Sequence, residues 1–247
     1  AISKNENLNL SIISDGNINY ACDLTKGLSC VVCNNDYGII YNENIDAVII
    51  SASYNRQIEL TKLCLIAGKN VLVDKLIGHQ REIIECYNLA KEKELILFVG
   101  LFKRHNLDYM KMKDKLKNFK NIYSVNRTSL DKPYRTSNGL IGEMIYYDLD
   151  VILHYLDFKM PNKILAIGNC ENKELKKVKE LEDLDIKLIY NNGLIINIST
   201  SRNSTYGFDD RIEIIDEEGL TKIINQPYNN IINTNKKGEI VSYVDNN

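Results

Sequence analysis

Polar side chains recur at helical spacing in the segment GLIGEMIYYDLD (139–150) and just beyond it. Four of them follow one another at spacings of four, three and four residues, which would place them on one face of a helix: Glu143, Tyr147, Asp150 and His154. Carboxylates, phenols and imidazoles are groups that can exchange protons with a bound substrate. The structural alternative is that Glu143 caps the start of the helix and the tyrosines bridge core and solvent.

A second group of candidates follows the strand-like runs in the first half of the chain. In a doubly wound sheet, ligands bind beyond the carboxyl ends of the strands. Asp15 ends an early run and has the placement of an acid that accepts hydrogen bonds from an adenosine ribose, although a turn aspartate in Asp-Gly-Asn is an equally good interpretation. The other candidates at strand ends are Ser51, Ala52, Asp74 and Lys75. The Lys75 ammonium could hold an alkoxide or carbonyl oxygen, or it is a surface lysine.

The elements around these residues alternate in the first half of the chain. Four apolar runs rich in Ile and Val are typical of strands: 8–14, 46–51, 70–74 and 95–100. Helical patterns lie between them at 57–67 and 80–93. This alternation predicts a doubly wound parallel sheet covered on both faces.

The second half is richer in strands. Strand-like runs occupy 122–125, 163–168, 185–190, 194–200, 211–215 and 220–224, and turn signals such as Asn191-Asn192-Gly193 join two pairs of them. These runs predict an open antiparallel sheet, with the helix that begins near Gly139 covering one face. We therefore predict two domains, an α/β domain over 1–118 and an α+β domain over 119–247.

Composition excludes several functional classes. The 247 residues are 44% hydrophobic and 26% charged, with a net charge of -2, so no positive field would attract nucleic acid or an anionic membrane. No apolar run approaches the roughly 20 residues needed to span a bilayer. The two cysteines of Cys30-Val-Val-Cys33 lack a second ligand pair, so we expect buried thiols and no metal site. The protein is expected to be cytoplasmic.

Four segments together resemble one family, the Gfo/Idh/MocA oxidoreductases, in the branch similar to myo-inositol 2-dehydrogenase. IDAVIISASYNRQIELTKLCLIAGKNVLVDKL resembles the strand, helix and strand that end in the family's E-K-P motif, and FVGLFKRHN resembles its V-G-x-x-x-R-F segment. TSNGLIGEMIYYDLDVILHYL is similar to the S-G-G-x-x-x-D-M-x-x-H-D-x-D helix. SRNSTYGFDDRIEIIDEEGL resembles S-R-x-x-x-Y-G-Y-D-Q-R-x-E-x-x-G-x-x-G-x, the most specific of the four.

This resemblance implies a Rossmann-type domain that binds NAD or NADP and a second domain that pairs with another subunit, giving a homodimer or homotetramer through the C-terminal sheet. Hydride would be transferred to or from a cyclitol or sugar derivative. Lys75 matches the motif lysine, Glu143 falls where the family has Asp, and Tyr147 falls where it has the catalytic His. The resemblance also implies that Tyr206 and Arg104 bind substrate.

The chain departs from the family motifs at the positions that carry the chemistry. A tyrosine with a pKa of about 10 accepts a proton near neutral pH only if a cation lowers that pKa, and Lys75 is the candidate cation for Tyr147. Asp74 replaces the glutamate of E-K-P, Leu76 its proline, and Gln57 a histidine of the preceding loop. These substitutions favour an alternative hypothesis, a catalytically degenerate relative that binds a ligand or pairs subunits.

The resemblance also bears on the ends of the domains. Residues 8–14 correspond to the second strand of the dinucleotide-binding fold, so the first strand and its G-x-G-x-x-G turn would precede Ala1. At the other end, the family continues beyond the position of Tyr228 with a stretch that ends in helices. We therefore expect the first domain to be incomplete at its N-terminus and the second at its C-terminus.

Replacement of Lys75 tests the catalytic interpretation. We expect Lys75→Ala to abolish dehydrogenase activity and to leave the melting temperature nearly unchanged, because the ammonium acts on the substrate oxygen and not on the core. Steady-state kinetics and calorimetric melting measure the two effects. A large loss of stability would show instead that the lysine is structural.

Overall fold

The computed structural model of the chain describes residues 2–115, 118–128, 139–203, 209–225, 229–235 and 240–244. The chain divides into two compact units, Ala1–Gly100 and Leu101–Asn247. Residues 101–118, which the sequence assigns to the first domain, therefore group with the second unit. A short 3-10 turn, η1 (Ile2–Lys4), opens the chain.

The strands of unit 1 are all parallel. β1 (Ile12–Ser14) pairs with β2 (Val31–Cys33), and β3 (Ala47–Ile50), β4 (Asn70–Val73) and β5 (Leu97–Val99) form a separate sheet in that order. In a doubly wound fold the first strand lies between the second and the fourth. If β1 is the second strand, as the sequence predicts, then β1 and β3 flank that position, and no described strand pairs with either of them there.

Helices follow the strands of unit 1, with the first two on β1 and β2 and the next two on the three-stranded sheet. α1 (Ile18–Leu24) and α2 (Asp36–Ile40) begin at asparagines whose side chains accept backbone N–H groups of the first turn. α3 (Tyr54–Ile66) and α4 (Gln80–Glu92) pack against each other over the strands. Their contact encloses the core of the unit, whose most buried members are Cys64, Leu65, Val71, Val73 and Cys86.

Unit 2 is built on one eight-stranded sheet, with the order β13-β12-β11-β10-β6-β9-β8-β7. Its strands are β6 (Asn121–Arg127), β7 (Lys163–Asn169), β8 (Asp183–Ile189), β9 (Ile195–Ser201), β10 (Asp209–Ile215), β11 (Gly219–Asn225), β12 (Asn229–Asn235) and β13 (Ile240–Val244). All pairs are antiparallel except β6 and β9, which are parallel. β12 and β13 lie beyond the last strand-like run predicted from the sequence.

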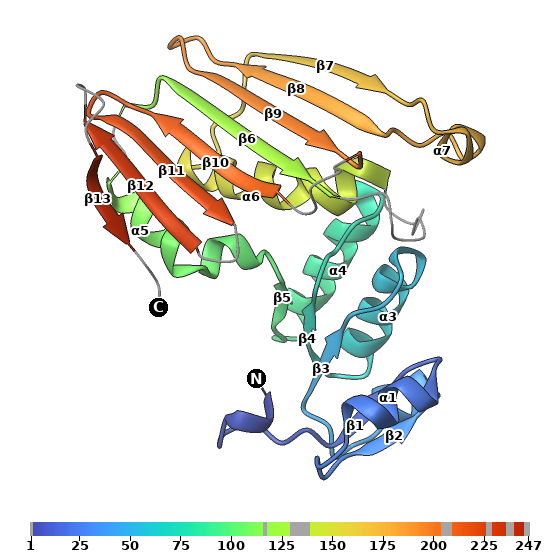
Figure 1. The fold of residues 1–247 in the computed structure, drawn as a ribbon. Helices are drawn as coiled ribbons and strands as arrows, with labels where there is room; N and C mark the ends of the chain where they lie inside the picture. Colours follow the sequence, from blue (N-terminus) through green and yellow to red (C-terminus); the bar gives the residue numbers. More distant parts are fainter. Residues whose placement is uncertain are drawn as a thin grey trace. The chain divides into compact units, whose positions relative to one another are not determined.

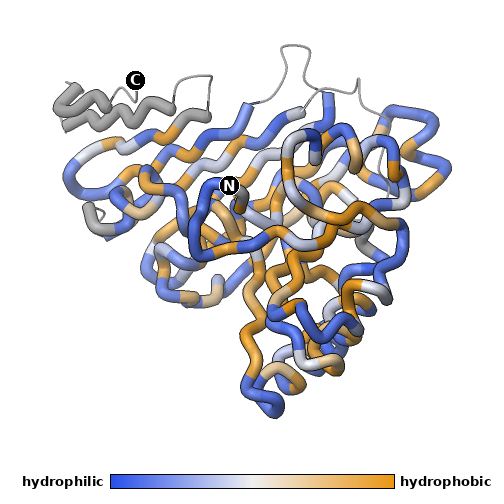
Figure 2. The backbone as a smooth tube through the Cα atoms, turned by 90° about the horizontal axis from the view of Figure 1, so that it is seen from below, coloured by the Kyte–Doolittle hydropathy of each residue, from blue (hydrophilic) through white to orange (hydrophobic). Residues whose placement is uncertain are grey.

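Two helices lie on the same face of this sheet, α5 (Leu107–Lys115) and α6 (Tyr146–Tyr155), as Figure 1 shows. A π-helical turn (Ile141–Ile145) precedes α6 and continues into it. Buried and less buried side chains alternate along β9 and β10, and Figure 2 shows the corresponding alternation of hydropathy in the large sheet. The predicted helix over one face of the sheet is therefore found, with its core between α6 and the strands.

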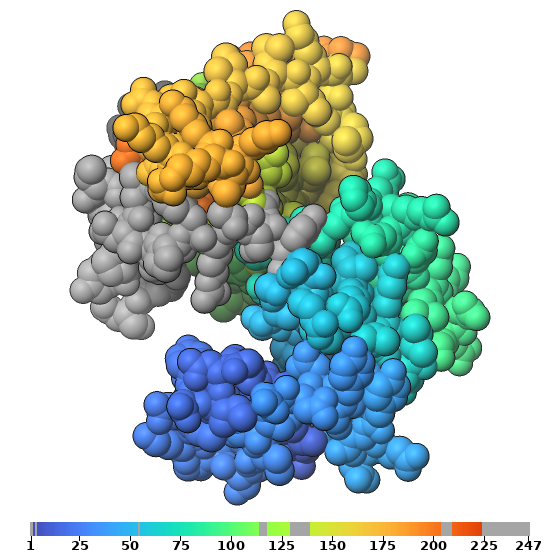
Figure 3. All heavy atoms as spheres, turned by 90° about the vertical axis from the view of Figure 1, so that its right-hand side faces the viewer, coloured from blue at the N-terminus to red at the C-terminus, as the bar shows by residue number. Residues whose placement is uncertain are grey.

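The opposite face of the sheet carries polar and apolar side chains in rows. Glu213 lies between Tyr123 and Lys222 in the register, and its carboxylate is 2.5 Å from the Lys222 ammonium and 4.0 Å from the Arg211 guanidinium. The edge strand β7 is exposed along its whole length, and Ile167 is 76% exposed. Figure 3 shows β7 and the short helix α7 (Lys173–Lys177) at the surface, in yellow to orange.

The cysteines are less buried than the sequence predicts. All six are free thiols, but only Cys64 and Cys86 are buried, whereas Cys22 is exposed. Burial raises the pKa of the Cys64 thiol to about 11, so this thiol stays protonated and unreactive at neutral pH. Among the residues described, no helix is both long and apolar enough to cross a membrane.

Gly100 marks a close approach between β4 and β5. Its N–H donates to the Val73 carbonyl at 2.8 Å, and a Cβ at this position would lie 3.0 Å from the Asp74 carbonyl oxygen and 3.2 Å from the Asp74 Cα. Because both neighbours are backbone atoms, they move only together with the strand end that carries Lys75. A side chain is therefore not tolerated here without a shift of the predicted site.

Gly100→Ala is expected to lower the free energy of unfolding by about 1–3 kcal/mol, the usual range for overpacking. Urea denaturation measures the change. Gly16→Ala is the matched control in the same unit, since a Cβ there meets nothing within 4 Å and the variant should be as stable as the parent or slightly more so. Equal stability of the two variants would contradict the close approach.

Candidate active site

Unit 2 contains a buried cluster of charged side chains that was not predicted from the sequence. Lys103 belongs to η2 (Phe102–His105), is 2% exposed, and donates hydrogen bonds to Asp148 of α6 and to Asp210 of β10, the second at 2.6 Å. Asp148 is fully buried, and Asn126 Nδ2 lies 3.5 Å from its second oxygen. The Tyr109 ring centroid is 5.6 Å from the ammonium.

Electrostatics keep the Lys103 ammonium charged. Burial alone would lower the pKa of Lys103, but the nearby Asp148, with Tyr109 and Asp210, raises it well above its usual range. For Asp210, burial raises the pKa, and the Lys103 ammonium opposes that shift only in part. Removing one partner of a buried ion pair costs about 3–5 kcal/mol, because the other charge stays buried without compensation.

Arg104, predicted to bind substrate, makes a two-pronged contact with Asp150 of α6. Its Nε donates to Asp150 Oδ2 at 2.5 Å, its Nη2 donates to Oδ1, and its guanidinium lies over the Phe158 ring at 5.0 Å from the centroid. His154 packs one turn further along, where burial, together with the Lys113 and Arg104 charges, lowers the pKa of its imidazole. Asp150 thus serves to bind Arg104, and the predicted role of Arg104 stays a prediction.

Tyr147, the residue at the expected position of the catalytic base, sits in an aromatic group. Its ring centroid is 4.5 Å from that of Phe102 and 5.5 Å from that of Tyr146, and the residue is 8% exposed. η2 therefore occupies part of the α6 surface that carries the predicted proton-exchanging groups: Phe102, Lys103 and Arg104 contact residues 147, 148 and 150 in turn. Pairing of opposite charges explains why acids occur at 148 and 150.

Glu143 lies in the π-helical turn and not in a regular α-helix. Turns of this type occur frequently at functional sites. Its Oε2 is 2.9 Å from Arg202 Nη2, an ion pair that lacks the angles of a hydrogen bond, and its side chain is 25% exposed while that of Arg202 is 7% exposed. The carboxylate is thus paired with a buried guanidinium and still reaches solvent. Tyr206 lies outside the described residues.

In unit 1 the candidate residues predicted to lie at the ends of strands do directly follow strands in the structure. Asp15 directly follows β1, and its Oδ1 accepts the Asn17 N–H at 2.7 Å, so the turn interpretation of this aspartate holds for one of its oxygens. The preceding Ser14 donates to Asp36 Oδ1 at 2.8 Å, and Asp36 Oδ2 accepts from Arg56 at 3.1 Å. This chain of contacts joins the carboxyl end of β1 to the first turn of α3.

The loop after β3 contains Ser51 and Ala52, and a buried glutamine holds it. Gln57 is 3% exposed, its Nε2 donates to the Ala52 carbonyl at 3.0 Å, and its Oε1 is buried with no hydrogen-bond partner among the described residues. After β4 come Asp74 and Lys75, both engaged in contacts of their own. The loops of Ser51, Ala52, Asp74 and Lys75 therefore start at the same edge of one parallel sheet, which fits part of a dinucleotide site.

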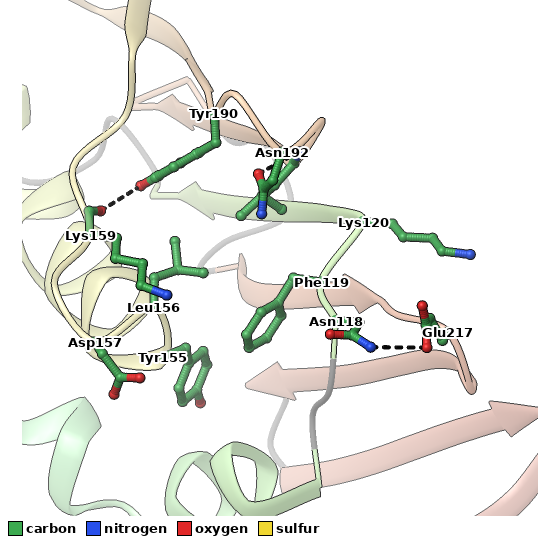
Figure 4. A pocket seen from close by; sticks show the side chains of 11 residues that line it. Asn118, Phe119, Lys120, Tyr155, Leu156, Asp157, Lys159, Tyr190, Asn192 and Glu217 are labelled. Atoms are coloured by element: carbon green, nitrogen blue, oxygen red, sulfur yellow. Dashed lines mark hydrogen bonds between the residues drawn. The ribbon is translucent and has the colours of Figure 1, made fainter.

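A pocket lined by residues of unit 2 lies away from the predicted site residues. Its volume is about 550 Å³, and it is at the end of α6 opposite to Glu143, between that helix, the start of β6 and the turn joining β8 to β9. Figure 4 shows its rim, where the Tyr190 hydroxyl donates to the Lys159 carbonyl at 3.1 Å and Asn118 donates to Glu217 at 3.0 Å. No predicted site residue lines this pocket.

Known proteins resemble the chain in sequence. No family model matches it. The myo-inositol 2-dehydrogenase of Thermotoga maritima is 25% identical over 211 residues, which are 81% of this chain and 63% of that enzyme. The chain thus spans less than two thirds of the length of this curated relative.

Solved structures show the same fold. The scyllo-inositol dehydrogenase of Lactobacillus casei, determined with bound NAD(H) and scyllo-inositol, superposes with a TM-score of 0.78 at 22% identity, covering 99% of this chain and 76% of that one. The UDP-N-acetylglucosamine 3-dehydrogenase of Acidithiobacillus ferrooxidans gives a TM-score of 0.80 at 18% identity, covering 96% and 76%. These likenesses confirm the predicted fold class, and the sequence relatives confirm the resemblance carried by the four motifs.

Proposed function

We propose that this protein, which resembles the Gfo/Idh/MocA oxidoreductases in their inositol 2-dehydrogenase-like branch, is an NAD(P)-dependent dehydrogenase of a cyclitol or a sugar derivative. The observation that carries the proposal is the similarity to an enzyme of myo-inositol over 81% of the chain. Lys75, which the resemblance identifies with the motif lysine, follows β4 and Asp74 directly.

The cofactor of the proposed enzyme is NAD or NADP. The inositol dehydrogenase of Lactobacillus casei, whose fold this chain shares, binds NAD(H). In unit 1, Asp15 would accept hydrogen bonds from the ribose, and the loop of Ser51 and Ala52, fixed by Gln57, would hold the part of the cofactor beyond β3. Asp74 and Lys75 would complete the cofactor site at the end of β4.

When bound, NAD or NADP would supply the nicotinamide that accepts or donates the hydride. Lys75 would donate to the substrate oxygen and stabilise the negative charge that develops on it. Glu143, partly exposed and paired with Arg202, would accept a hydrogen bond from a substrate hydroxyl. Tyr147 would exchange the hydroxyl proton, and Tyr206 and Arg104 would bind the rest of the polyol.

The proposed assembly is a homodimer or homotetramer formed through the large sheet of unit 2. Its face opposite α5 and α6 combines apolar side chains with ion pairs, the mixture typical of an interface between subunits. Tyr123, 40% exposed at the middle of this face, is the type of residue enriched in such contacts.

A specific observation favours the second hypothesis, a relative that binds its ligand without turnover. Tyr147 is 8% exposed and packed between Phe102 and Tyr146. Packing between two aromatic rings leaves little of this side chain exposed to meet a substrate hydroxyl. In that case the protein would keep the fold, the cofactor loops and the subunit contact, and would serve as a ligand-binding or subunit-pairing protein.

Calorimetric titration separates the two functions. We expect the protein to bind NAD or NADP and then to reduce the cofactor with at least one polyol from a panel of inositols and sugars, followed by absorbance of the reduced nicotinamide. Cofactor binding without turnover on any polyol would favour the degenerate relative. Absence of binding to either cofactor would refute both forms of the proposal.

Replacing the phenol by an imidazole tests the base directly. We expect Tyr147→His to raise kcat by roughly tenfold or more, since an imidazole with a pKa of about 6.5 accepts a proton near neutral pH far better than a phenol does. The matched control is Tyr146→His, which places the same imidazole one position away and should not raise kcat. A fall of kcat in the first variant alone would show that the phenol itself is required.

A further inference from the structure

The buried cluster joins three elements that are far apart in the chain. Lys103 lies in η2, and its carboxylate partners are 45 residues away in α6 and 107 residues away in β10. All three side chains are at least nine-tenths buried, with Lys103 and Asp210 exposed by 2% and 6% in their side chains and Asp148 by 0%. A contact of this kind fixes α6 relative to both η2 and the sheet.

The cluster is directly next to the proposed catalytic phenol. Asp148 follows Tyr147 in α6, and Lys103 follows Phe102, whose ring is 4.5 Å from that of Tyr147. The ion pair and the ring contact are therefore neighbouring contacts, and both join η2 to α6. A rotation of α6 that breaks the ion pair also moves the phenol, because successive side chains of a helix move as one body.

Stability alone does not account for a lysine and two aspartates buried together. Apolar side chains of similar volume often stabilise a protein as well as a buried ion pair or better, and the ionic arrangement is then kept for the single geometry it imposes. An ammonium has three N–H donors, and two of them are used here by carboxylates on different elements. A rotation of α6 would carry Asp148 away from Lys103, while Asp210 would stay with the sheet.

We propose that Lys103 is a positioning residue of the proposed dehydrogenase: by binding Asp148 and Asp210 together, it sets the rotation of α6 at which Tyr147 and Glu143 act on the substrate. The catalytic part of this inference rests on the proposed function, whereas the placement of Tyr147 by Lys103 is a property of the folded chain. The two are therefore tested separately.

A variant that lacks all three ionisable side chains tests the proposal while the protein stays folded. Lys103→Met alone leaves two buried carboxyl groups without their cation, so its melting temperature should be far below that of the parent. The triple variant Lys103→Met, Asp148→Asn, Asp210→Asn leaves no buried charge in the cluster, so its melting temperature should be closer to that of the parent. We expect its kcat to fall by about ten- to a hundredfold with a smaller change in KM, since a displacement of about 1 Å has effects of this order.

The matched control is Lys113→Met, which removes a lysine that pairs with Asp157 just beyond α6 at 3.5 Å in an exposed place. Its kcat should stay within twofold of the parent, roughly the noise of such assays for surface charges. A folded triple variant with the kcat of the parent would overturn the proposal. If the triple variant does not fold, Lys103→Arg keeps the charge but changes the donor directions, and an unchanged kcat in that variant would equally overturn it.

A measurement without turnover keeps the two proposals apart. The protein is labelled with fluorotyrosine, the ¹⁹F resonance of Tyr147 is assigned from Tyr147→Phe, and its position is compared among the variants. We expect this resonance to shift in the triple variant or in Lys103→Arg and to stay in place in Lys113→Met. If the parent turns over no polyol, the proposed function fails and this resonance alone decides the role of Lys103, with an unmoved signal refuting it.

Discussion

One buried ammonium determines much of the arrangement of unit 2. Lys103 is held by two carboxylates in the interior, where an unpaired charge would be costly, so η2, α6 and β10 must meet at one place. This requirement explains why residues 101–115 belong with the second unit although the strand before them belongs to the first. It also explains why the segment that carries Tyr147 has a fully buried acid beside the phenol.

The sequence predicted most of the regular structure, because hydrophobic period and turn residues act locally. The four runs of unit 1 and the six of unit 2 all contain strands, with ends shifted by a few residues. β12 was missed because asparagines and a threonine surround its two isoleucines, and β13 was missed although Ile-Val-Ser-Tyr-Val is typical of a strand. The parallel pairing of β6 with β9 was also not predicted, because those strands are distant in the chain and no short turn signals their contact.

The candidate site was predictable to the extent that it follows from topology. Lys75 and Ser51 lie at strand ends because parallel strands share one carboxyl edge. Lys103 was missed since a lysine next to an arginine in a short turn reads as solvent-exposed. A signal was present all the same: the adjacent cations at 103 and 104 match acids at 148 and 150, and opposite charges in two otherwise apolar segments indicate pairing. The partner of Glu143, Arg202, had no such signal.

The rows of charge on the open face of the large sheet make its properties depend on ionic strength. The Glu213 carboxylate and its two cationic neighbours are a quarter to a third exposed, so dissolved ions reach them, and the screening length is about 10 Å at 0.1 M salt. Screening weakens these pairs but leaves the apolar side chains between them unaffected. Association of two molecules through this face would then be maintained or strengthened by added salt, because the burial of apolar surface would drive it.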